Sequence, residues 1–190
     1  MICFRPPSSS RIDAFLQLSE QSRFSYRQTG QSISRKTVSG FDNDLNEVQL
    51  GHGQAVFRKA SEAIRRWKMF PGGWAWIEPG TAPIKTGQNV AMVARVMGIY
   101  WVSNCRIVYV LDEEKPVRRF GFAYGTLREH VEKGEELFSV EWRADDSVWY
   151  VLRAFSKPRF WLARLAYPVA RYFQRKFVKE SLEKMKKEMK

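Results

Sequence analysis

The chain has 190 residues, a length that fits one domain whose core is large enough to fold without disulfide bonds or metal ions. Hydrophobic residues make up 44% of the chain and charged residues 27%, which excludes a wholly disordered, collagenous or membrane-embedded protein. The formal net charge of +12 leaves anionic partners open, and the aromatic share of 14% indicates a core or a cavity rich in rings.

The cysteine content and the N-terminal sequence indicate a cytoplasmic protein. Cys3 and Cys105 are too few for a disulfide framework and are expected to be reduced thiols. Residues 1–18 lack the continuous apolar stretch of a secretory signal. The longest apolar run, residues 90–102, is interrupted by Arg95 and is too short to span a bilayer.

The positive charge is concentrated at the end of the chain. Residues 153–190 carry 12 Lys and Arg against 3 Asp and Glu. A basic terminal helix could dock on an anionic membrane surface or, as the less favoured alternative, on nucleic acid. The simpler interpretation is a solvated outer face.

The pattern of residues 1–73 predicts a helix, an irregular arm, a strand and a second helix. Residues 10–21 have a narrow apolar stripe typical of a helix. Residues 22–44 are polar and rich in Ser, Thr, Gly and Asn, as expected of an arm with at most one short strand. Residues 46–50 alternate as a strand does, and residues 55–67 show a strong helical periodicity that Pro71-Gly72-Gly73 ends.

From there to Pro158 the apolar period is two, which predicts strands. Seven are expected, at residues 74–78, 89–96, 99–103, 106–112, 118–127, 135–143 and 147–156. The connectors are too short to hold a crossover helix, so the sheet must be antiparallel. The fold class is therefore α+β.

A long C-terminal helix, or a pair of helices, is expected over residues 159–189. Pro168 either kinks this helix or starts a new one. One face of the sheet can take this helix. The apolar stripe changes direction after Phe177, so we expect three parts: an N-terminal helix and arm (1–44), a core domain (45–178) and a basic helical tail (179–190).

The excess of aromatic side chains leaves two interpretations open: a solid ring-rich core, or a cavity for a small apolar or aromatic molecule between the sheet and the last helix. The apolar residues of several strands occupy both phases, so both faces of the sheet must be covered. The candidate lining residues are Trp74, Trp76, Tyr109, Phe122, Tyr124, Trp149 and Phe173, together with Arg106 as the minority clamp for a ligand carboxylate.

Blocks along the whole chain carry a resemblance to a known family. These blocks are Leu50-Gly51-His52-Gly53 and residues 105–110, 120–127, 130–136 and 154–158. They are similar to uncharacterised protein family 0548, found in bacteria and plants. The element order resembles the helix-grip fold of the Bet v 1/START-like superfamily. This resemblance implies a curved sheet of about seven strands wrapped around the C-terminal helix, and a small apolar ligand, with no established activity.

The polar residues give only weak catalytic candidates. The densest polar group lies around the turn after a Gly-rich strand and consists of Tyr124, Thr126, His130, Glu132, Glu135 and Glu136. Of these, Tyr124, His130 and Glu132 could act in acid–base chemistry. A structural turn is the stronger interpretation of His130. No metal site and no cofactor is expected. Arg106 opens an apolar strand and is expected to pair with Glu135 or Glu141.

Three hypotheses follow. The preferred one is a module that binds a small hydrophobic or aromatic molecule between the sheet and the last helix. The alternatives are an enzyme that acts on such a molecule through Tyr124, His130 and Glu132, and a protein that docks on anionic lipid through residues 159–190. Nucleic acid is the least favoured partner, because the aromatic strands carry few cations.

Overall fold

A computed structural model describes residues 1–190 except 35, 115–116, 129, 131 and 160–166. Its centre is an eight-stranded antiparallel sheet in which seven strands follow the order β2-β8-β7-β6-β5-β4-β3, and β1 pairs with β5. The strands are β1 (Ile2–Cys3), β2 (Asp42–His52), β3 (Ala75–Glu78), β4 (Asn89–Val96), β5 (Ile99–Glu113), β6 (Arg118–Thr126), β7 (Glu132–Trp142) and β8 (Ser147–Pro158). The predicted α+β class and antiparallel meander are confirmed.

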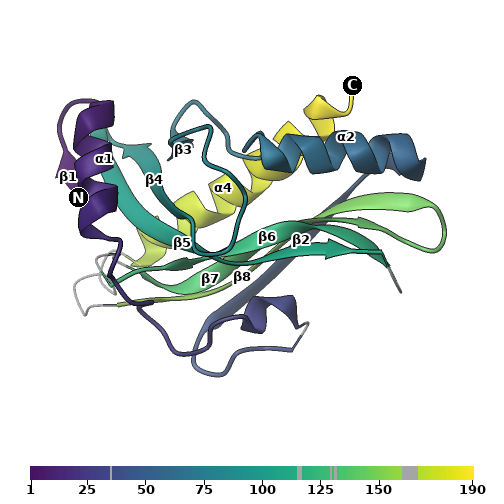
Figure 1. Ribbon diagram of the computed structural model, residues 1–190, viewed down its shortest axis with the longest axis horizontal. Coiled ribbons are helices and arrows are strands. Elements are labelled where there is room, and N and C mark those ends of the chain that lie inside the picture. Colours follow the sequence, from purple (N-terminus) through teal and green to yellow (C-terminus); the bar gives the residue numbers. More distant parts are fainter. Residues whose placement is uncertain (35, 115–116, 129, 131, 160–166) are drawn as a thin grey trace.

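Both faces of the sheet are covered, as the two-phase apolar pattern predicts. The concave face packs against α2 (Gly53–Arg65) and α4 (Tyr167–Glu188), which lie above the sheet in Figure 1. At the β4 and β5 end, α1 (Ser9–Leu18) covers the opposite face. The arm that follows α1, with the short helix η1 (Gln31–Ile33), runs below the sheet (Figure 1).

The C-terminal helix is gripped by the sheet along its length. The ring of Phe177 lies 5.3 Å from that of Phe70, and the hydroxyls of Ser181 and Tyr150 share a hydrogen bond of 2.9 Å. Met185 is fully buried. These contacts confirm the helix-grip arrangement and show that residues beyond 179 continue α4 on the core.

Pro168 is the second residue of α4, so its missing N–H falls in the first turn, where no intrahelical bond is lost. Residues 160–166, which the sequence assigns to the same helical segment, lie outside the described residues.

One strand replaces the two predicted at residues 99–103 and 106–112. The 15-residue β5 contains a register shift between Ile107 and Tyr109. Ile107 packs in the core below α2 and α4, whereas Leu111 packs with Ala123 on the other face. Because the irregularity changes which residues face the helices, apolar side chains occupy both phases of this strand.

The arm of residues 22–41 is fastened to the sheet by a buried carboxylate. The Tyr26 hydroxyl and the Gly30 N–H each donate to one oxygen of Glu135 at 2.8 Å. The Ser32 N–H donates to the other oxygen at 3.0 Å, and the Ser32 hydroxyl also donates to it. A segment with almost no regular structure therefore has a defined path across the sheet.

Within the described part of the chain, no helix is both long enough and apolar enough to cross a membrane.

Candidate functional site

A polar cluster lies at one end of the interface between the sheet and α4. The register places Tyr124, Glu136, Ala154 and Asp44 side by side in one row across β6, β7, β8 and β2. The Tyr124 hydroxyl donates to Oε2 of Glu136 at 2.8 Å. The cluster thus lies on four adjacent strands, of which β2 is far from the other three in sequence.

The first turns of α4 supply the remaining polar groups. Gln174 Nε2 donates to both carboxylate oxygens of Glu132, at 2.8 and 3.0 Å. Arg171 forms a bidentate ion pair with Asp44, at 2.7 and 2.9 Å, and its Nη1 also donates to the side-chain Oε1 of Gln174 at 2.8 Å. This last bond turns the Gln174 amide so that its NH₂ group faces Glu132. We call these six residues, Asp44, Tyr124, Glu132, Glu136, Arg171 and Gln174, the polar end.

The three carboxylates of the polar end have different electrostatic surroundings. Burial raises the pKa of Glu136 to about 7, and the nearby charges of Glu132 and Asp44 act in the same direction. Burial also raises the pKa of Glu132 above its ordinary value, although its bond to Gln174 opposes this. The guanidinium of Arg171 holds the pKa of Asp44 below its usual range. Glu136 therefore titrates near neutral pH.

Glu132 and Glu136 retain partial exposure although they lie beneath α4. Within the described chain, the Tyr124 hydroxyl is the single hydrogen-bond donor to the Glu136 carboxylate. A carboxylate in such surroundings normally attracts a cation or several N–H donors. The arrangement can therefore accept hydrogen bonds from an incoming group, and Glu136 can take up or release a proton.

The middle of the interface is filled by aromatic rings. Phe138 lies 5.6 Å from Phe122 and 5.4 Å from Tyr124, and Trp67 lies 4.8 Å from Phe122, measured between ring centroids. Phe122 and Phe138 are fully buried. Of the two interpretations of the aromatic excess, the packed core describes this region.

Comparisons with known proteins place the chain in a family. Residues 25–184 match the family described as "Domain of unknown function (DUF1990)". A UPF0548 protein of Dictyostelium discoideum is 38% identical over 98% of this chain and 95% of its own length. A UPF0548 protein of Deinococcus radiodurans is 31% identical over 93% and 92% of the two chains. The chain belongs to the UPF0548/DUF1990 family.

The family assignment confirms the resemblance drawn from the blocks of the sequence that are similar to this family. A crystal structure of a hypothetical protein from Helicobacter pylori has a TM-score of 0.56 at 12% identity, and the match covers 89% of this chain and 98% of the other. At that identity the likeness shows a shared fold alone.

His130 does not join the other two catalytic candidates of this UPF0548 protein. Its Nδ1 accepts a hydrogen bond of 2.9 Å from the backbone N–H of Glu132. Burial lowers the pKa of His130 to about 4, so its ring is neutral at physiological pH. The structural turn is thus the interpretation that the geometry favours. Tyr124 is paired with Glu136, and the Glu132 side chain is paired with Gln174.

The predicted lining residues divide between the two faces of the sheet. Phe122 and Tyr124 belong to the core beneath α2 and α4, and Trp74 contacts Phe173 of α4 at 5.6 Å. The prediction that all of them line the space beside α4 is wrong for four. Trp76 packs with the α1 cluster, and the Tyr109 hydroxyl bonds to Ser32 of the arm. The other two residues on the far face are Trp149, stacked under Arg143, and Arg106.

The expected pairing of Arg106 with Glu135 or Glu141 is also wrong. Its guanidinium donates to the backbone carbonyls of Ser19, Glu20 and Ser22, at 2.8 to 2.9 Å, while Nε donates to Asn89 Oδ1 at 2.7 Å. These carbonyls follow the last turn of α1, where unpaired backbone acceptors are concentrated. Arg106 therefore fastens the end of α1 to the sheet.

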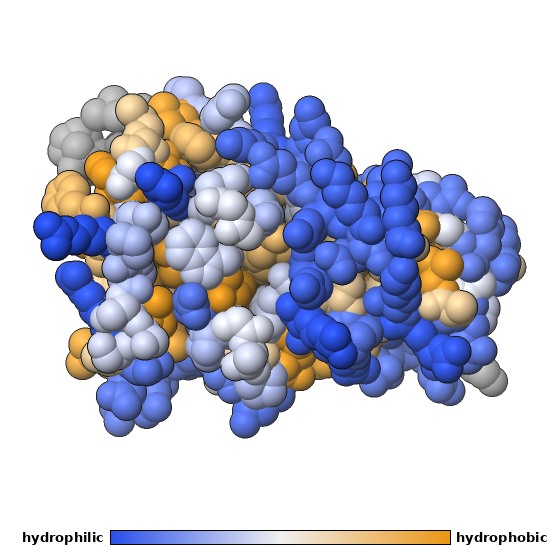
Figure 2. Space-filling model, turned by 90° about the horizontal axis from the view of Figure 1, so that it is seen from above, coloured by the Kyte–Doolittle hydropathy of each residue, from blue (hydrophilic) through white to orange (hydrophobic). Residues whose placement is uncertain are grey.

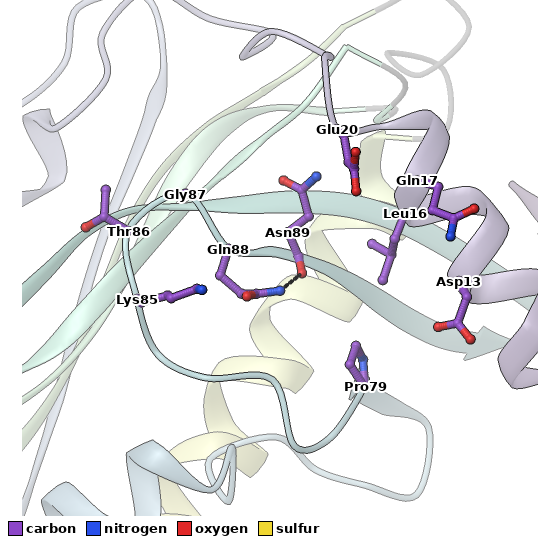
Figure 3. Close-up of a pocket in the computed structure, with 10 residues that line it drawn as sticks. All are labelled: Asp13, Leu16, Gln17, Glu20, Pro79, Lys85, Thr86, Gly87, Gln88 and Asn89. Atoms are coloured by element: carbon purple, nitrogen blue, oxygen red, sulfur yellow. Dashed lines mark hydrogen bonds between the residues drawn. The ribbon is translucent and has the colours of Figure 1, made fainter.

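An open pocket of about 630 Å³ lies beside this junction, between α1 and the loop that leads into β4. Figure 3 shows Leu16 of α1 facing Asn89 across it, with Asp13 and Gln17 on the same helix. Its walls are mainly polar and exposed. Among the described residues, no group of three or more His, Cys, Asp or Glu side chains is arranged to hold a metal ion.

Sequence reasoning missed three members of the polar end: Asp44, Arg171 and Gln174. It grouped Glu136 with Tyr124 and Glu132, and the phase that Glu136 shares with Phe138 and Val140 places it on the core side. Asp44 and Arg171 are 127 residues apart, and no spacing rule relates them.

Proposed function

We propose that this protein binds a small molecule that has an apolar or aromatic body and a head that donates hydrogen bonds, such as an amine. The head would meet Glu136 and Glu132, and the body would lie against the rings at the edge of the packed core. The observation that carries the proposal is that Glu136 lies within the sheet–helix interface and, among the residues that the structure describes, accepts a hydrogen bond from one neutral donor, Tyr124.

The charge balance of the polar end supports a cationic or N–H-rich head. Arg171 pairs with Asp44, and its charge also acts on Glu132, which accepts from Gln174. Among the described residues, Glu136 accepts from the neutral hydroxyl of Tyr124. Charge buried without a partner is unfavourable, and a bound ammonium group would offset that penalty for Glu136. A ligand carboxylate at the same place would be repelled.

The apolar body is supported by the neighbours of Glu136 on the concave face. Tyr124 and Phe138 line β6 and β7 next to it, and Phe177 of α4 lies 6.4 Å from Phe138. An aromatic or branched apolar group at the edge of these rings would gain burial without displacing the core.

The test uses three indole probes that differ only in their head: tryptamine, 3-methylindole and indole-3-acetate. The melting temperature of the full chain, followed by circular dichroism, should rise most with tryptamine and least with the acetate. Glu136→Gln should remove the preference for the amine. Glu183→Gln, which changes an exposed carboxylate on α4, is the matched control and should leave the preference unchanged.

Equal stabilisation by all three probes, or a stronger effect of the acetate, would contradict an acceptor site at Glu136. Native mass spectrometry of the purified protein gives an independent reading. A co-purifying anionic molecule retained by the Glu136→Gln variant would overturn the proposal.

Acid–base catalysis on the bound molecule is the second candidate function. A carboxyl whose pKa is about 7 exchanges protons readily at neutral pH, and the Tyr124 hydroxyl is 2.8 Å away from it. Turnover that follows the titration of Glu136 and falls in Glu136→Gln, with binding of a neutral-headed probe retained, would support it. Unaltered probe molecules after long incubation at several pH values would count against it.

A further inference from the structure

Several large apolar side chains are exposed at one end of the molecule. Met97 is 89% exposed, Phe4 82%, Ile2 52% and Trp101 37%. Ile2 and Trp101 are cross-strand partners of β1 and β5, Phe4 directly follows β1, and Met97 lies in the β4–β5 turn. Figure 1 shows β1 and the end of β4 at the same end of the molecule. We call these four residues the apolar tip.

Met97 lies in a turn whose backbone conformation is unfavourable for a residue with a long side chain. Val96 pairs with Ile99, so Met97 and Gly98 form a two-residue hairpin loop, and their φ angles are 51° and 80°. A loop with two positive φ angles favours Asn, Asp or Gly at its first position, not a long side chain. The Met97 side chain is almost fully exposed and so gains little burial in return. Neither backbone preference nor packing explains this residue.

The two segments that form the apolar tip carry charged residues of one sign. Residues 1–12 and 89–111 contain no Asp or Glu, and they contain Arg5, Arg11 and Arg95, all exposed. Arg106, the remaining cation of these segments, is tied to the end of α1. Figure 2 shows hydrophobic atoms reaching the surface at this end with strongly hydrophilic side chains beside them. Exposed apolar groups on segments whose charged residues are all arginines suit the boundary between anionic headgroups and acyl chains.

We propose that the apolar tip docks on an anionic lipid bilayer, with Met97 and Phe4 entering the interface and Arg5 and Arg95 contacting lipid phosphates and carboxylates. Trp101 would sit at headgroup depth, where indole rings are favoured. The contact is peripheral. It differs from docking through the basic part of α4, where Arg171 and Lys176 are engaged with Asp44 and Glu180.

The test measures sedimentation of the full chain with phosphatidylcholine vesicles, with and without phosphatidylserine. We expect binding to require phosphatidylserine and to weaken with salt. Met97→Asn should lower the partition coefficient about tenfold, as expected from losing one buried apolar side chain. Because Asn suits the turn, this variant should melt at the same temperature as the original chain or higher. Leu18→Ser is the matched control, since Leu18 is 84% exposed at the end of α1, and it should bind normally.

Two further variants separate the sources of binding. Arg5→Gln with Arg95→Gln should remove the preference for phosphatidylserine. Lys186→Gln with Lys187→Gln should have little effect, and loss of binding in this variant alone would assign the contact to α4 and overturn the proposal. A chain that dimerises through the tip, becomes monomeric in Met97→Asn and ignores vesicles would overturn it in favour of a second copy.

Discussion

The hydroxyl of Tyr26 occupies the space directly over Gly125, so that a Cβ atom at position 125 would overlap it. The same hydroxyl donates to Glu135 on the adjacent strand. The glycine at position 125, next to the last residue of β6, is therefore explained by the close approach of the arm. The face of β6 that lacks a side chain at Gly125 is thus occupied by Tyr26 of the arm.

Gly125→Ala should displace Tyr26 and detach the arm. A buried carboxylate that loses a donor costs about 1–3 kcal/mol, and the free energy of unfolding in urea should fall by a similar amount. Tyr26→Phe should show the same loss without the overlap. Gly73→Ala is the control, because a Cβ there would meet nothing within 4 Å. A Gly125→Ala protein as stable as the original would mean that the arm is not held at this point.

Arg106→Met should loosen α1 while leaving the rest of the sheet intact. The variant keeps the length of the side chain but loses three bonds to backbone carbonyls beyond α1. We expect a loss of about 2 kcal/mol in the free energy of unfolding. Hydrogen exchange should accelerate for residues 9–23 and stay unchanged in β7 and β8. Arg58→Met, on the exposed face of α2, provides the baseline, and uniform acceleration in every strand would contradict a local role.

The free energy of unfolding should decrease as the pH rises from about 4.5 to about 7. In that window the unfolded chain releases the proton of Glu136 while the folded chain keeps it, so the folded state binds more protons and is favoured on the acidic side. The pKa shift bounds the effect at about 3 kcal/mol, and partial exposure reduces it to about 1–2 kcal/mol.

Glu136→Gln should flatten this pH dependence and stabilise the protein most above neutral pH. Urea denaturation at about pH 4.5 and above pH 7 measures the free energy of unfolding on both sides of the titration. Glu183→Gln should retain the slope of the original chain. A slope that survives Glu136→Gln would assign the titration to another group, such as Glu132, whose pKa is also raised by burial.

Met185→Ala should destabilise the protein by about 2–5 kcal/mol, because the side chain is fully buried beneath the end of α4. Lys187→Ala, two residues further on, is exposed and should change the melting temperature little. Equal melting temperatures for the two variants would indicate that the basic end of the chain is a solvated extension.

The main helices and strands could be predicted from the sequence because the spacing of apolar residues within each of them is a local feature. The bounds of β4 follow directly from alternation over residues 89–96, and the strong helical period of residues 55–67 gives α2 to within two residues. The strand β1 and the short helix η1 were not predicted. Each has two or three residues, which is too few to show a periodic pattern of apolar residues.

The faces of the strands were harder to predict than the strands themselves. Where apolar residues occupy both phases, alternation does not say which phase meets α4, and Trp149 and Tyr109 were assigned to the wrong side for this reason. The bulge in β5 adds to the difficulty. The candidate site was predicted only where its members are close in sequence, as Tyr124 and Glu132 are, whereas Gln174 reaches Glu132 across 42 residues.

Trp74 spans three consecutive turns of α4. Its ring lies 5.6 Å from that of Phe173 and 5.1 Å from the Lys176 ammonium, and its indole N–H donates to Glu180 at 2.6 Å. Any sliding or tilting of the helix must change the polarity around this indole. The difference in fluorescence emission between the original chain and Trp74→Phe therefore provides a built-in optical reporter of helix position, readable during a titration without an added label.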